Sequence, residues 1–147
     1  MKARQFVTGV LMICGLAAGP ALAGEAPPKP IEGPFTPIHF AVTNAATEAM
    51  ECQAVAGHWY SFALPGAAPG KVADLALFFA PKTGTLVMFN EAKDPLPIEQ
   101  VVCGFAGHAY ETQYRFAMRA LARQAVETGR PVPLTCRTQG GRLECSE

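Results

Sequence analysis

Four of the five cysteines lie after residue 23, and they constrain the fold strongly because each disulfide fixes two distant points of the chain. The dipeptide Gly140-Gly141, which is typical of tight hairpin turns, separates two of them. If these glycines are the central turn residues, Cys136 lies opposite Cys145, at a non-hydrogen-bonded pair where side chains approach closely. That geometry suits a disulfide, so the register predicts a Cys136–Cys145 bridge.

The two other cysteines of this region, Cys52 and Cys103, are then expected to pair with each other. The rival connectivity joins Cys103 to Cys136 and leaves Cys52 for Cys145. Neither a Cys-x-x-Cys redox motif nor a Cys-x-x-Cys-His haem motif occurs in the sequence. The spacing between the cysteines also differs from that of zinc sites, which need close ligand pairs. We therefore interpret all four as structural.

Disulfides require an oxidising compartment, and residues 1–23 resemble a secretory signal. Lys2 and Arg4 give a positive start, residues 6–18 form a short apolar run, and Ala21-Leu22-Ala23 supplies a small-x-small cleavage site. The run is too short and too rich in Gly and Ala for a good membrane span. The sequence thus predicts a cleaved signal peptide and a periplasmic or secreted protein.

The fifth cysteine, Cys14, lies inside this apolar segment. A lipoprotein signal wants a small residue just before its cysteine, and Ile13 is not small, so we favour removal of Cys14 with the signal over its lipidation. Residues 24–34 hold four prolines and are predicted to form a disordered, extended tether. Residues 35–147 are expected to form one disulfide-linked globular domain.

The charge balance excludes one class of partner. The whole chain has 12 Lys plus Arg against 12 Asp plus Glu, and removal of the signal makes this balance slightly negative. Nucleic-acid binding needs clustered positive charge, so no nucleic-acid partner is expected. No long apolar run follows the signal, and we expect the mature chain not to span a membrane.

Turn residues and alternating apolar residues predict a mainly β domain. Residues 35–42 are predicted to form a first edge strand, since Pro37 disfavours the centre of a sheet. Residues 43–50 are Ala-rich and are expected to form one or two helical turns. Residues 81–84, Pro-Lys-Thr-Gly, suit the turn of a hairpin. Further strands are predicted at residues 58–64, 74–80, 85–90, 98–103, 132–138 and 142–146.

One long helix is predicted over residues 110–128. The residues on its apolar stripe recur at helical spacing. They are Tyr110, Tyr114, Ala117, Leu121 and Ala125, with Met118 and Ala122 beside them. Gly129 occupies the position of a C-cap glycine, and Pro131 prevents the helix from continuing.

The order of three strands, a helix and two strands is that of the OB-fold, a small Greek-key barrel. Residues 120–136 (ALARQAVETGRPVPLTC), followed by the Gly140-Gly141 hairpin, resemble a passage of small exported OB-fold proteins, which include the binding subunits of secreted toxins. The resemblance covers the C-terminal helix and hairpin. It implies an α+β fold with a five- to six-stranded antiparallel barrel and a binding surface for a protein or glycan. An oligomer is compatible with it.

Candidate binding residues are Trp59, Tyr60 and Arg119. Trp59 and Tyr60 are adjacent on a predicted strand and point to opposite faces, so one of them is expected to face solvent as a platform for a sugar ring or a side chain. Arg119 belongs to an arginine row with Arg115 and Arg123, which either binds an anionic group or forms helical ion pairs such as Glu111–Arg115.

Catalytic signals are weak, so we expect a binding module with no cofactor rather than an enzyme. No nucleophile-elbow Gly-x-Ser-x-Gly motif occurs in the sequence. Glu48 with Glu51 forms a carboxylate pair, but it lies in a predicted turn region. The alternative hypothesis is a small exported enzyme or a copper- or zinc-binding protein that uses His58 and His108.

Overall fold

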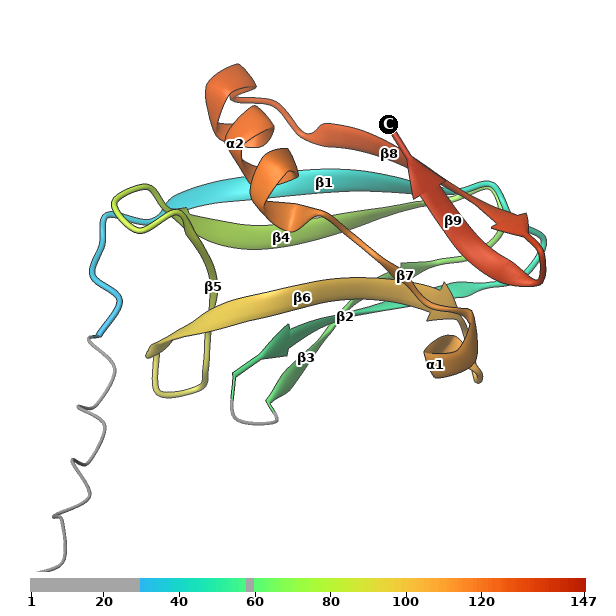
Figure 1. Cartoon of the computed structure of the whole chain (residues 1–147), viewed down its shortest axis with the longest axis horizontal. Helices are drawn as coiled ribbons and strands as arrows, with labels where there is room; N and C mark the ends of the chain where they lie inside the picture. The colour runs from blue at the N-terminus through green and yellow to red at the C-terminus, as the bar shows by residue number, and fades with distance from the viewer. Residues whose placement is uncertain (1–29, 58–59) are drawn as a thin grey trace, which may run out of the picture.

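The computed structural model describes residues 30–57 and 60–147, and these form a mainly β fold (Figure 1). Residues 30–35 contain no helix or strand. Two helices follow from residue 109 onward, α1 (Ala109–Thr112) and α2 (Met118–Thr128). The strands are β1 (Thr36–Asn44), β2 (Met50–Ala56), β3 (Ser61–Ala67), β4 (Val72–Ala80), β5 (Thr85–Phe89), β6 (Pro95–Phe105), β7 (Tyr114–Arg115), β8 (Val132–Gln139) and β9 (Arg142–Ser146).

The strands form one nine-stranded sheet with the order β3-β2-β6-β5-β4-β1-β8-β9, and β7 also pairs with β6. Among the strands that the structure describes, only the β1–β8 pair is parallel. Because β6 pairs with β5 at residues 95–97 and with β2 at residues 98–105, it joins two halves of the sheet that face each other as layers (Figure 1). The predicted closed barrel of five or six strands is therefore wrong: the sheet is open, and β3 and β9 end the strand order.

Alternating apolar side chains build the core between the two layers. The inward positions of β1 and β4 are buried and their outward positions are more exposed, the period-two pattern of a sheet with one solvated face. The largest fully buried side chains include Phe40 and Leu75 from one layer and Phe105 from the other. Helix α2 contributes Met118, Ala122 and Ala125 to this core cluster.

Strand β1 is not an edge strand, because it lies between β4 and β8. Pro37 pairs with Phe78 of β4, but β8 joins β1 only from Phe40 onward. Pro37 thus needs no hydrogen-bonding partner on its second side, so a central strand tolerates it. The prediction for residues 35–42 was right about the strand and wrong about its place in the sheet.

Residues 43–50 do not form helical turns. Strand β1 continues to Asn44, a bend follows, and β2 begins at Met50. The side chain of Asn44 accepts a hydrogen bond from the Ala46 amide at 3.0 Å and donates one to the Glu48 carbonyl at 2.8 Å. This asparagine therefore sets the bend by replacing the helical hydrogen bonds.

The predicted helix over residues 110–128 is interrupted. Tyr114 and Arg115 leave the helical path and pair as β7 with Cys103 and Val102 of β6, which divides the region into α1, β7 and α2. The predicted end is correct: Gly129 adopts a left-handed conformation (φ 62°), and its N–H binds the Ala125 carbonyl. In the described part of the chain, no helix has the length and apolarity needed to span a membrane.

Both predicted hairpins are present. Ala80 pairs with Thr85 around the turn that contains Gly84. In the C-terminal hairpin Gln139 pairs with Arg142, and each pair outward from the glycines has the predicted register.

The two disulfides join adjacent strands. Cys136 of β8 is bonded to Cys145 of β9, and Cys52 of β2 is bonded to Cys103 of β6. This is the connectivity that the hairpin register favours over the rival pairing. The longer link spans 51 residues and fixes β2, which the sequence analysis did not predict, against β6.

Candidate functional site

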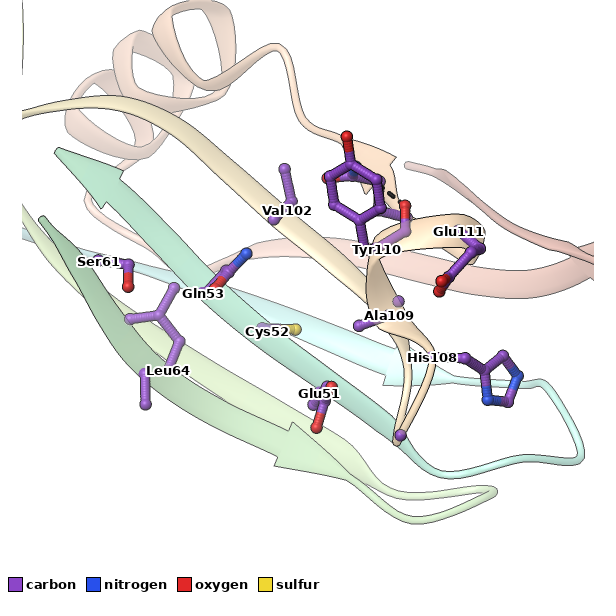
Figure 2. Close-up of a pocket in the computed structure, with 14 residues that line it drawn as sticks. Glu51, Cys52, Gln53, Ser61, Leu64, Val102, His108, Ala109, Tyr110 and Glu111 are labelled. Atoms are coloured by element: carbon purple, nitrogen blue, oxygen red, sulfur yellow. Dashed lines mark hydrogen bonds between the residues drawn. The ribbon is translucent and has the colours of Figure 1, made fainter. Parts of the chain in front are cut away.

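A groove of about 900 Å³ lies on the outer face of β3, β2 and β6, beside α1 (Figure 2). We call it the outer groove. Its lining mixes small, amide, carboxylate and aromatic side chains. The lining residues are Glu51, Cys52, Gln53, Ser61, Ala63, Leu64, Val102, Gly104, Gly107, His108, Ala109, Tyr110, Glu111 and Gln113.

Strand register brings the floor of the outer groove together. Gln53 of β2 lies between Ala63 of β3 and Val102 of β6, and Glu51 lies opposite Gly104. Figure 2 shows Gln53 and Val102 on neighbouring strands, to the left of α1 in this view. Because Ala63 is small, the groove stays open above the sheet beside Gln53, whose side-chain amide offers a donor and an acceptor there.

The wall of the outer groove is α1, which packs directly on β6 at Gly104. A side chain at this position would meet the Ala109 backbone, with its Cβ only 2.7 Å from the Ala109 Cα. Thr112 holds the same helix from its other end. Its buried hydroxyl accepts a hydrogen bond from the Phe105 amide at 2.9 Å and donates one to the His108 carbonyl at 3.0 Å. A helix this short is not stable alone, so its contacts with Gly104 and Phe105 of β6 hold α1 in place.

We expect Gly104→Ala to lower the free energy of unfolding by about 1–3 kcal/mol, because α1 or β6 must move to accept the methyl group. Gly57→Ala is the matched control, since its Cβ would meet only the flexible Glu99 side chain, with Oε1 at 3.3 Å. Urea titration of both variants checks the prediction. Equal stabilities for the two variants would show that the close contact at Gly104 does not position α1.

Tyr110 is the most exposed aromatic side chain of the described residues, with 82 % of its surface accessible. It rises from α1 beside the groove (Figure 2), and Gln113 donates a hydrogen bond to its carbonyl at 3.1 Å. The helix predicted over residues 110–128 has Tyr110 on its apolar stripe. That placement is wrong, because α1 ends at Thr112 and the buried side of this segment consists of Thr112 rather than the tyrosine.

His108 lines the outer groove at the N-cap of α1. Its Nε2 lies 3.4 Å from a carboxylate oxygen of Glu48, and both side chains are about half exposed. His58, its proposed metal-binding partner, lies outside the described residues. Residues 30–57 and 60–147 contain no cluster of three His, Cys, Asp or Glu side chains that could hold a metal ion.

Of the three predicted binding residues, the structure describes Tyr60 and Arg119. Trp59 lies outside the described residues. Tyr60 is 60 % exposed just before β3, but it does not line the outer groove. Arg119 instead lines a second cavity of about 680 Å³ between α2, β5 and β6. The helical pair Glu111–Arg115 does not exist, since Glu111 belongs to α1 and Arg115 to β7.

Comparison of the chain with protein-family models, with curated proteins and with solved structures gives no match.

Proposed function

We propose that this chain is an exported, non-catalytic binding module whose ligand is a saccharide held in the outer groove. The observation that carries this proposal is the position of an exposed tyrosine, Tyr110, beside a floor that offers the Gln53 amide. Sugar rings combine an apolar face, which stacks on an aromatic ring, with hydroxyl groups that both donate and accept hydrogen bonds. The predicted signal and the two disulfides support a periplasmic or secreted location.

The distribution of exposed apolar side chains favours a small ligand over a protein partner. The exposed large apolar residues of the described chain are Tyr60, Val72, Tyr110 and Val126, and only Tyr110 lines the groove. A stable protein interface buries about 800 Å² on each side around an apolar centre. The outer groove has the size of a small-molecule site, typically about 300–1,000 Å³, so a short oligosaccharide fits it better.

We expect Tyr110→Ala to weaken saccharide binding about tenfold, because it removes the stacking surface. Because the Tyr110 side chain is exposed, the free energy of unfolding of Tyr110→Ala is expected to stay within about 0.5 kcal/mol of the wild-type value. Isothermal titration calorimetry of the oxidised protein with neutral and amino-bearing oligosaccharides measures the binding change, and urea titration measures stability.

Tyr60→Ala is the matched control, because it removes an exposed tyrosine outside the groove and is expected to bind normally. Loss of binding in Tyr60→Ala but not in Tyr110→Ala would move the site away from the outer groove. If the folded protein binds no oligosaccharide and instead captures a protein partner, the saccharide proposal is wrong. Release of new reducing ends during incubation would contradict the non-catalytic part.

A further inference from the structure

Acidic residues outnumber basic residues among the described residues that line the outer groove. Glu51 enters from β2 and Glu111 from α1, and both are exposed to solvent. In the described part of the chain the lining contains no lysine or arginine, and its one basic group there is His108, which already faces Glu48. The groove therefore presents carboxylates from two elements to any ligand that rests on its floor.

Among the described residues, the basic side chain that strand register places beside the groove does not line it. Arg115 is the basic residue placed nearest by strand register, opposite Val102 on β7, but it does not line the groove. A carboxylate only accepts hydrogen bonds and attracts cationic donors, whereas it repels the carboxylate of a uronic acid. Charge complementarity thus distinguishes among saccharides of similar shape.

We propose that the outer groove prefers saccharides that carry a free, protonated amino group over neutral saccharides and over uronic acids. This inference rests on the proposed function and names its ligand class. The sugar ring stacks on Tyr110 while the ammonium group binds the carboxylates of Glu51 and Glu111. Both carboxylates are solvent-exposed, so each contact is expected to contribute about twofold to fivefold in affinity and to weaken with added salt.

Three tetrasaccharides of similar length test this preference in calorimetric titrations: chitosan tetrasaccharide, its fully N-acetylated counterpart, and tetragalacturonate. We expect the chitosan probe to bind most tightly and tetragalacturonate to bind most weakly. Glu51→Gln and Glu111→Gln should each reduce the preference for chitosan over the N-acetylated probe by about twofold to fivefold, and together by about tenfold. Glu91→Gln, in the exposed turn between β5 and β6, is the matched control and should leave it unchanged.

The outcomes separate the two proposals. Equal binding of the chitosan and N-acetylated probes, with no effect of Glu51→Gln or Glu111→Gln but a loss in Tyr110→Ala, overturns the amino-sugar preference and leaves the saccharide site standing. Absence of binding by all three probes, and by neutral cello-tetrasaccharide, overturns the saccharide site itself. Tetralysine is a further probe: if it binds as tightly as chitosan and ignores Tyr110→Ala, charge alone explains binding and the preference for a sugar is wrong.

Discussion

Replacing Asn44 with alanine is expected to lower the free energy of unfolding by about 3–5 kcal/mol. The Asn44 side chain is 0 % exposed. Its amide nitrogen donates to the carbonyls of Glu48 at 2.8 Å and Ala67 at 2.9 Å, and its oxygen accepts from the Ala46 amide at 3.0 Å. Alanine leaves these backbone groups without their partners, at about 1–3 kcal/mol for each group that stays buried. Urea titration followed by circular dichroism measures the loss.

Asn90→Ala provides a control with the same change in side chain. Asn90 bonds Asp94 through both of its amide atoms, at 2.8 and 3.3 Å, but this turn is exposed and water can replace both bonds. We expect a cost below about 1 kcal/mol. Failure of Asn44→Ala to fold would agree with the prediction. A cost equal to that of Asn90→Ala would show that Asn44 does not hold the bend to the end of β3.

Removal of the longer disulfide is expected to have a comparably large effect. The double substitution Cys52→Ala/Cys103→Ala should cost about 4 kcal/mol, whereas Cys136→Ala/Cys145→Ala should cost about 2.7 kcal/mol. The difference arises because the first bridge closes a loop between residues 51 positions apart and the second joins residues 9 positions apart. The longer bridge restricts the unfolded chain more.

Guanidinium titration of both double variants, with thiol counts by mass spectrometry, measures these two costs. Both bridges consist of buried cysteines, so the loss of packing is similar and the comparison isolates loop length. A larger cost for the short bridge would contradict the account based on loop entropy. Free thiols in protein from an oxidising compartment would contradict the disulfides themselves.

The parts of the fold that follow from local sequence could be predicted. Hairpin turns connect residues that are close in the chain, so the Gly140-Gly141 turn determined the register of β8 and β9 and with it the Cys136–Cys145 pair. Gly129 likewise ended a helix where its freedom to adopt positive φ was needed. These elements depend on one or two residues and on no distant partner.

The long helix was wrong because two periods compete in the same segment. Thr112, Phe116 and Met118 are buried at every second position, with Tyr114 half-buried between them, and this alternation is typical of a strand. Tyr114 and Phe116 pack edge to face at 5.1 Å between ring centroids. The helical stripe through Tyr110, Tyr114 and Ala117 coincides in part with these residues. The available edge of β6 decided the outcome, and sequence pattern does not reveal that edge.

The candidate site was predicted only in part, because it depends on contacts between distant strands. Glu51 and His108 were candidates from the sequence, whereas Gln53 was missed because β2 was not predicted. Tyr110 was predicted to lie on the apolar stripe of a helix but is exposed. The floor of the outer groove exists because β2 pairs with β6, about fifty positions further along the chain, and no local signal gives that register. Gly104 was the one local signal available, since a glycine inside an apolar strand often marks a close approach of another backbone segment. Here that segment is the backbone of Ala109.

The most direct test of the binding site is a nuclear magnetic resonance titration of ¹⁵N-labelled protein with cello- and chitosan-tetrasaccharide. We predict that the amide shifts change in residues 51–53 of β2, at Val102 and in residues 108–113 around α1, the segments that line the outer groove. The amides of Leu86 and Arg119 at the second cavity are expected to stay unchanged. Shifts confined to the second cavity, with the outer groove silent, would contradict the account.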